Sequence, residues 1–289
     1  MKILTYSAIL LLPLFISSKE QHPTAVITKT QTIALMGAAQ GISYINDTLF
    51  VYGDREVGVM RAYRWDDSLT YLNKEYTFTQ AGKNIINHPT GIAYNGEGPT
   101  FIGNSIRMNK EGTLWKAVIY EIDWKLFLAS GNLDKSLLHT IEDDACIQGT
   151  RPEYVKYNQK WAVATADYGG KANEVRLYDP VKLSKAKKTS DQGVLIGKFT
   201  CSPWVQNLKW IAEKDMLVLI QNQIEGRKWR LTFLKLSESL KTGKEVVVSV
   251  IDLNKEDELE GFTFLNHLNK GIGVSSSSKD NISILELKW

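Results

Sequence analysis

Hydrophobic and polar positions repeat five times along this chain. Each repeat opens with a polar residue, continues with a turn-compatible or bulky one, and then alternates aliphatic and aromatic side chains as strands do. The five segments are 40–45 (QGISYI), 90–95 (TGIAYN), 153–158 (EYVKYN), 206–211 (QNLKWI) and 260–265 (EGFTFL). The segments start at residues 40, 90, 153, 206 and 260, so successive starts lie 50, 63, 53 and 54 positions apart. Such a period is typical of a four-stranded antiparallel blade with its loops.

Three further apolar runs follow most of these segments. The second runs are 49–53, 101–103, 161–165, 216–220 and 271–274; the third are 59–65, 117–124, 174–178, 230–236 and 281–289; the fourth are 74–79, 137–141, 194–200 and 245–253. Four runs per repeat and five repeats predict an all-β, five-bladed β-propeller of four-stranded antiparallel blades. The insertion at 125–135 makes the second repeat the longest, and a short helix is expected at 124–130.

The fifth repeat ends at Trp289 without a fourth run, while a strand-like segment, 25–35, stands unassigned near the N-terminus. An open sheet edge leaves backbone groups unpaired and invites aggregation. We therefore predict that residues 25–35 form the outer strand of the last blade and close the ring. A β-sandwich would explain neither the repeat nor the missing strand.

The first residues predict export. Lys2 is followed by an apolar run from Ile3 to Ile16 and then by Ser17-Ser18, the pattern of a secretory signal peptide. This run is shorter than the roughly 20 residues of a membrane span. We expect a signal peptide at 1–18, a single propeller domain at 19–289, and a secreted or periplasmic monomer with no membrane span. Export permits disulfides, and Cys146 and Cys201 allow at most one within the chain.

Charge adds little to this picture. The formal net charge is +3, and it is spread along the chain, so a nucleic-acid partner is not expected.

The repeat register predicts where polar side chains gather. In a propeller the innermost strand of each blade starts at the face where the second strand ends. Residues before strand one and after strand two should therefore surround one mouth of the central channel. The candidate ligand-binding residues at this mouth are Gln40, Asp54, His88, Asn104, Arg151, Glu153, Asp167, Trp204, Gln206 and Glu260.

Oxygen-bearing side chains around a ring suit Ca²⁺, which takes six to eight oxygen ligands. The candidate metal ligands are Asn104, Glu153, Asp167 and Glu260. At Leu259-Glu260-Gly261 the chain loosely resembles the calcium-dependent propeller hydrolases of the gluconolactonase and paraoxonase group, which place a glutamate at the start of an inner strand. The resemblance covers the architecture and these strand ends, and those families have one blade more than the five repeats here. It implies a metal-assisted hydrolase of an ester or lactone, with calcium as cofactor.

Two other chemistries remain open at the same mouth. Paired carboxylates such as Asp54, Asp167, Glu153 and Glu260 are the groups that hydrolyse glycosides. Alternatively, the mouth binds a small molecule or glycan without catalysis, with Trp204 offering a flat surface for a sugar. No G-x-S-x-G or phosphate-loop motif occurs, so the sequence slightly favours the binding role.

Overall fold

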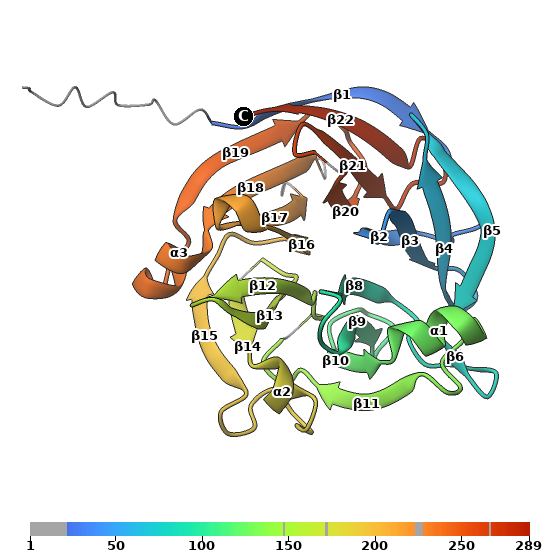
Figure 1. Ribbon diagram of the computed structural model, residues 1–289, viewed down its shortest axis with the longest axis vertical. Helices are drawn as coiled ribbons and strands as arrows, with labels where there is room; N and C mark the ends of the chain where they lie inside the picture. The colour runs from blue at the N-terminus through green and yellow to red at the C-terminus, as the bar shows by residue number, and fades with distance from the viewer. Residues whose placement is uncertain (1–21, 147, 171–172, 223–227, 266) are drawn as a thin grey trace, which may run out of the picture.

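The computed structural model describes residues 22–146, 148–170, 173–222, 228–265 and 267–289. Five four-stranded antiparallel sheets are arranged around a central axis, as Figure 1 shows. The structure therefore confirms the predicted five-bladed propeller. The signal peptide predicted at 1–18 lies outside the described residues. Within the described part, no helix is long and apolar enough to cross a bilayer.

Each blade runs from an inner strand to an outer one in chain order, except the last. The first four blades are β2–β5 (Ala39–Ile45, Thr48–Asp54, Gly58–Trp65, Leu69–Thr77), β8–β11 (Pro89–Ala93, Thr100–Arg107, Trp115–Ile122, Leu137–Glu142), β12–β15 (Glu153–Tyr157, Lys160–Ala166, Glu174–Tyr178, Leu195–Thr200) and β16–β19 (Val205–Ile211, Met216–Asn222, Trp229–Lys235, Val247–Leu253). The five predicted inner segments overlap β2, β8, β12, β16 and, in the last blade, β20 (Leu259–Phe264). Of these strands, β2, β8 and β20 are buried along most of their length, so the alternation of aliphatic and aromatic side chains marked them, and not an alternation of buried and exposed faces.

The last blade joins both ends of the chain. It consists of β20 (Leu259–Phe264), β21 (Lys270–Ser275), β22 (Ile282–Lys288) and the N-terminal β1 (Thr24–Gln31). Strand β1 pairs antiparallel with β22 from Thr24 opposite Lys288 to Gln31 opposite Ile282. The predicted closure is thus confirmed, with the strand ending at Gln31 and not at 35. Beyond it, Asn281 continues the connection by accepting from the Ile33 N–H at 2.9 Å and donating to the Ile33 carbonyl at 2.9 Å.

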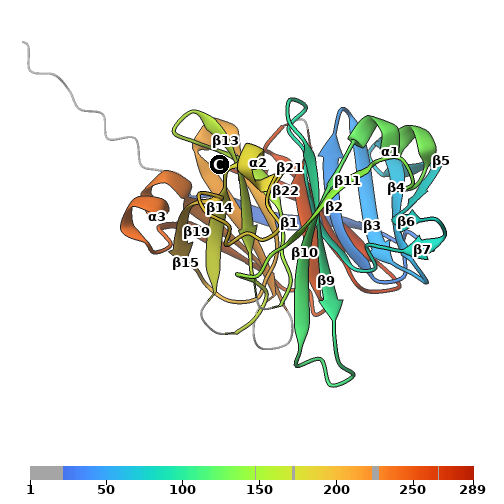
Figure 2. The same ribbon diagram turned by 90° about the horizontal axis from the view of Figure 1, so that it is seen from below.

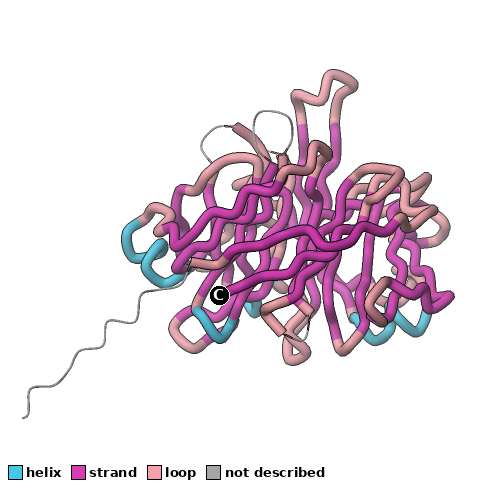
Figure 3. Tube along the Cα trace, turned by 90° about the horizontal axis from the view of Figure 1, so that it is seen from above, coloured by secondary structure: helices cyan, strands magenta, loops and turns pink. Residues whose placement is uncertain are grey.

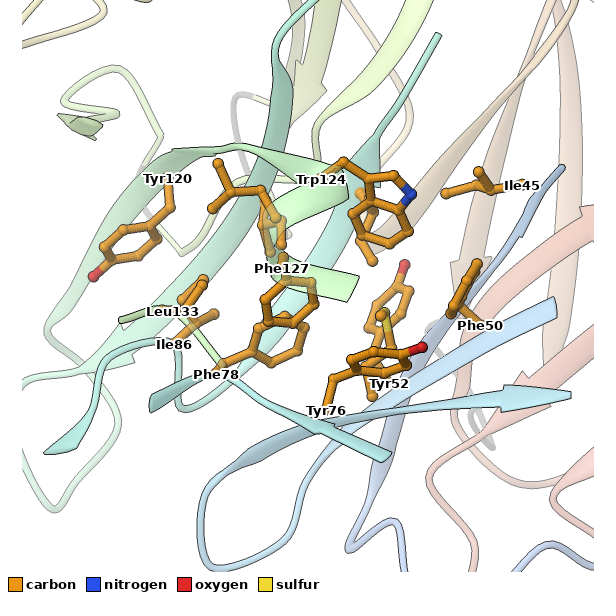
Figure 4. Close-up of a cluster of buried hydrophobic side chains, with 14 of the residues drawn as sticks. Ile45, Phe50, Tyr52, Tyr76, Phe78, Ile86, Tyr120, Trp124, Phe127 and Leu133 are labelled. Atoms are coloured by element: carbon orange, nitrogen blue, oxygen red, sulfur yellow. The ribbon is translucent and has the colours of Figure 1, made fainter. Parts of the chain in front are cut away.

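The hydrophobic core is divided among the interfaces between blades. One cluster lies between the first and second blades, where aromatic side chains gather (Figure 4). Phe78 stacks on Phe127 with ring centroids 5.4 Å apart, and Phe50 meets Trp124 edge-on at 5.2 Å. Such pairs hold adjacent blades together because each buried ring removes a large apolar area from water.

Short helices lie in the connections between strands, and one strand hairpin is unusually long. The expected helix appears as α1 (Trp124–Ser130), capped by the Asp123 carboxylate, which accepts from the Leu126 N–H. Among the described residues, four elements were not expected: α2 (Pro180–Leu183), the 3-10 helix η1 (Ala212–Lys214), α3 (Leu236–Thr242) and the small hairpin of β6 (Thr79–Gln80) and β7 (Lys83–Asn84). The β9–β10 hairpin projects beyond the rest of the propeller, at the end opposite α1 (Figures 2 and 3).

The two cysteines do not pair. Cys146 is buried, Cys201 is half-buried, and both are free thiols. Cys146 Sγ instead accepts from Arg176 Nη1 at 3.4 Å.

Candidate functional site

Four of the five inner strands begin with a β-bulge. The pairing register with the second strand shifts at Gln40, Thr90, Gln206 and Glu260. A bulge bends the strand and re-aims the extra side chain, and bulges are frequent beside binding sites. In these four repeats the polar residue that opens the repeat is the bulged residue.

A glycine follows three of these bulges because the inner strands crowd together at the axis. A Cβ on Gly261 would lie 2.8 Å from the Cα of Gly41 in the adjacent blade. Only glycine permits this approach.

Three of the four bulged residues, Gln40, Gln206 and Glu260, line one pocket at the mouth of the channel, which has a volume of about 330 Å³. We call it the mouth pocket. The fourth bulged residue, Thr90, donates its hydroxyl to the Thr150 carbonyl instead. All five blades, counted with the connectors that lead into them, contribute to its lining. The lining residues are Ala38, Gln40, His88, Ser105, Arg107, Trp115, Gln148, Arg151, Tyr168, Gln206, Glu258, Glu260 and Ser276. Five of the ten predicted ligand-binding residues, namely Gln40, His88, Arg151, Gln206 and Glu260, are thus brought together.

A histidine–carboxylate pair stands at one edge of the pocket. His88 Nδ1 lies 3.1 Å from Asp54 Oδ2, and Gln40 Nε2 lies 3.5 Å from the same oxygen. The other carboxylate oxygen of Asp54 accepts from the Ala38 N–H at 3.0 Å. Asn104 positions the histidine, because its Oδ1 accepts from the His88 N–H at 2.9 Å. Asp54 and Asn104 therefore support the pocket from behind without lining it.

Arg151 is the buried cation of the pocket, with only 3% of its surface exposed. Its guanidinium donates to the carbonyl oxygens of Gln206 (3.1 Å) and Gln148 (3.1 Å) and to Gln206 Oε1 (3.4 Å). It also lies over the ring of Tyr168, 5.3 Å from the centroid. Burial lowers the pKa of Arg151, while the nearby carboxylates of Asp167 and Glu260 act in the opposite direction.

The fifth blade contributes the acidic side chains of the mouth pocket. Glu258, just before β20, and Glu260, at its bulge, both line the pocket. Glu258 Oε1 accepts from Gln206 Nε2 at 3.0 Å and from Asn222 Nδ2 at 3.5 Å. Gln206 therefore bridges the cation Arg151 and the anion Glu258 through the two ends of its amide.

The β9–β10 hairpin forms one rim of the pocket. Arg107 is exposed, and its guanidinium lies 5.2 Å from the centroid of the Trp115 ring. Asn109 orders the turn beyond them, since its Oδ1 accepts from the N–H groups of Thr113 and Leu114, both at 3.0 Å. The charged rim is therefore held by local contacts within the hairpin.

The remaining predicted site residues lie outside the lining. Glu153 accepts from Lys209 Nζ at 3.0 Å and from the Trp210 N–H at 3.1 Å. Its strand has no bulge, so Glu153 pairs regularly with Ala164. Asp167 accepts from the Gln148 N–H at 2.7 Å. Trp204 meets Tyr168 edge-on at 5.2 Å, behind the pocket wall.

The predicted calcium ligands are not gathered into one group. Across the described ranges, no cluster of three or more His, Cys, Asp or Glu side chains could hold a metal ion. Glu153 is committed to Lys209, and a buried arginine stands near both Asp167 and Glu260. Because these cations compete with any metal for the carboxylates, the arrangement does not fit the predicted calcium site. Calcium binding stays a prediction of the sequence alone.

Sequence reasoning missed several lining residues, namely Ala38, Ser105, Arg107, Trp115, Gln148 and Glu258. Two signals pointed to some of them. Glu258 stands two positions before Glu260, so the entrance to the predicted inner strand carries two acidic residues close together in sequence. Arg107 and Trp115 flank a polar turn between two long strands, which marks a hairpin extending past the mouth.

No protein-family model matches the chain, and no curated protein sequence matches it. Among solved structures, Myxococcus xanthus glutaminyl cyclase is similar, with a TM-score of 0.55, 13% identity, and coverage of 92% of this chain and 97% of that chain. A glucose dehydrogenase is similar with a TM-score of 0.51, 7% identity, and coverage of 91% and 99%. At these identities the likeness shows the fold alone. The chain is a β-propeller whose fold neighbours include enzymes.

Proposed function

We propose that this protein is an exported binding protein that holds a small polar molecule in the mouth pocket. One observation carries the proposal: side chains from all five blades converge on a single pocket at the channel axis. Polar residues at isolated strand ends can be satisfied by hydrogen bonds to water alone. A shared concave pocket with a few convergent polar groups is instead typical of a ligand-binding site. The apolar segment at 3–16 supports export.

The size and lining of the pocket support a small polar ligand. A volume of about 330 Å³ is near the lower end of the range for ligand pockets. The lining combines amides, hydroxyls and both signs of charge, with the rings of Trp115 and Tyr168 as the large flat surfaces. These groups suit a molecule rich in hydrogen-bonding atoms, such as a sugar, an amino acid or an organic acid.

The binding proposal is tested by thermal shift against a library of sugars, amino acids, organic acids and nucleosides at millimolar concentration. We expect at least one compound to raise the melting temperature, because a ligand of the native state stabilises it by mass action. Gln40→Phe should fill the pocket and abolish the rise. The matched control is Gln80→Phe, on the small β6–β7 hairpin and outside the pocket lining. A library without any hit, or hits that survive Gln40→Phe, would contradict the proposal.

A catalytic role is the second candidate, and the His88–Asp54 pair favours it. A carboxylate that accepts from Nδ1–H leaves Nε2 as a proton acceptor, the arrangement of a general base. In that role His88 would activate water against an ester, lactone or glycoside in the pocket. Incubation of each library hit with the protein, followed by mass spectrometry, tests this candidate. Turnover that is lost in both His88→Gln and Asp54→Asn supports catalysis, and unchanged hits leave binding as the function.

A further inference from the structure

We infer that the mouth pocket recognises its ligand by a single carboxylate, held by Arg151 and Ser105 and steered in by Arg107. The inference rests on the proposed binding function and adds the chemical class of the ligand. It starts from two buried polar groups whose hydrogen-bonding capacity exceeds the contacts that the protein makes with them.

The first group is the Arg151 guanidinium. It carries five N–H donors, and the protein supplies acceptors for one on Nε, one on Nη1 and one on Nη2. All three acceptors are neutral oxygens. Asp167 and Glu260 stand near enough to act on the pKa of Arg151, but among the described residues no carboxylate is in ion-pair contact with its guanidinium. A buried charge is normally paired, because an unpaired one loses its hydration without compensation. The N–H groups that remain on Nη1 and Nη2 belong to a residue that lines the pocket.

The second group is the Ser105 hydroxyl. Ser105 is 2% exposed, lines the pocket, and its Oγ has no hydrogen-bond partner within the described part of the chain. A buried hydroxyl without a partner costs free energy that a ligand oxygen would recover. Gly149 shows that the two groups are neighbours. A Cβ at this position would overlap Ser105 Oγ and lie 2.8 Å from Arg151 Nη1, so the glycine keeps this corner of the pocket open.

The charge of the pocket selects the kind of anion. An arginine fork matches the planar geometry of a carboxylate and binds it through two parallel hydrogen bonds. Glu258 and Glu260 line the same pocket and disfavour a ligand with two or three negative charges, such as phosphate or citrate. A monocarboxylate whose other end is neutral or positive, such as an amino acid or a hydroxy acid, satisfies both constraints. Arg107 on the exposed rim attracts the anion before it enters.

Isothermal titration calorimetry of the full chain tests the inference. The probes are the standard L-amino acids, lactate and glycolate, each compared with its primary amide, which has nearly the same size but no charge. We expect one or more acids to bind and the matching amides to bind at least about tenfold more weakly, the usual effect of losing a charge-assisted hydrogen bond. Inorganic phosphate and citrate should bind more weakly than the best monocarboxylate.

Three variants locate the carboxylate. Arg151→Gln should weaken binding about tenfold or more, and Ser105→Ala about threefold to tenfold. Arg107→Gln keeps the buried residues intact and should slow association, most clearly at low salt. Arg64→Gln is the matched control, because Arg64 pairs with the exposed Asp66 away from the pocket. If Arg151→Gln fails to fold, Ser105→Ala and Arg107→Gln still decide the question.

The outcomes separate the two proposals. If a sugar or nucleoside binds, this binding is lost in Gln40→Phe and no acid binds, the carboxylate inference is overturned and the binding function stands. Acids and amides that bind equally well overturn it too, as does phosphate that binds more tightly than any monocarboxylate. No binding by any probe removes both proposals.

Discussion

His88 and Asp54 join the first two blades at the edge of the mouth pocket. His88 lies on the connector into the second blade, and Asp54 ends the second strand of the first blade, yet Nδ1 and Oδ2 are 3.1 Å apart. The same carboxylate also accepts from the Ala38 N–H, on the connector that leads into β2. A single side chain therefore holds two connectors at the mouth.

We expect Asp54→Ala to destabilise the protein by about 1–3 kcal/mol, because the Ala38 N–H and the His88 ring lose their acceptor. Asp54→Asn should cost less, since its amide oxygen still accepts one of these hydrogen bonds. Urea unfolding followed by tryptophan fluorescence measures both. As a control, Asp66→Ala removes an exposed carboxylate paired with Arg64 and should cost under about 1 kcal/mol. Equal losses for Asp54→Ala and Asp66→Ala would show that the shared carboxylate does not organise the mouth.

Removing the closing strand should prevent the chain from remaining a soluble monomer. Deletion of residues 1–31 leaves β22 as an edge strand with unpaired backbone groups, which favours aggregation or pairing with another chain. Deletion of residues 1–21 leaves β1 in place and should leave folding unchanged. Size-exclusion chromatography and circular dichroism distinguish the two proteins. A monomeric, cooperatively folded 32–289 fragment would contradict the role of β1 in closure.

Through Glu75, part of the free energy of unfolding should depend on pH. Arg55 Nη2 and Arg61 Nη2 lie 2.8 Å and 2.6 Å from its two carboxylate oxygens, and hydrogen bonds from Arg55 above all lower the pKa of Glu75 below its usual 4.5. The ionised form is thus favoured in the native state. Its stabilisation is fully present above about pH 4.5 and is lost as the pH falls through the lowered native pKa.

Glu75→Gln should therefore lower stability at pH 7 and flatten its decline in acid. Urea unfolding between pH 7 and pH 3 measures the change in slope, and Glu286→Gln, at an exposed strand position, is the control. If the free energy of unfolding falls equally steeply below about pH 4.5 in the two variants and the parent, the ion pairs with Glu75 do not contribute to the acid response.

Both cysteines should be free and slow to react. Burial raises the pKa of the Cys146 thiol and raises that of Cys201 to about 12, so little of either is present as the nucleophilic thiolate at pH 8. We expect slow alkylation by iodoacetamide in the native protein and rapid alkylation of both thiols in urea. Dithiothreitol should not change the melting temperature. A mass lower by two hydrogens before reduction, or a fall in melting temperature after it, would indicate a disulfide.

The sequence predicted the architecture well because the strand pattern is local. Alternating side chains reveal a strand wherever one face is buried, and the repeat of that pattern gave the blade number. The closing strand was also predictable, since an incomplete last blade and an unassigned first strand have one simple solution. The predicted strand extended to residue 35, whereas β1 ends at Gln31.

The composition of the site was predicted less completely. Glu153 occupies the same place in its repeat as Gln40, Gln206 and Glu260, yet it pairs with Lys209 outside the pocket. The register explains the difference, because β12 begins without the bulge that the other three strands have. A bulge depends on how two strands pair, and no single segment encodes it alone.

The sequence by itself determined that the chain forms five antiparallel blades, that its N-terminal strand completes the ring, and on which face the polar strand ends meet. The tertiary structure alone decided which side chains share the mouth pocket. Arg151, Ser105 and Glu258 come from three different blades or their connectors, and their approach depends on inter-blade packing and on a glycine at 149. Those contacts span tens to hundreds of residues along the chain, so no local pattern of polar and apolar positions can specify them.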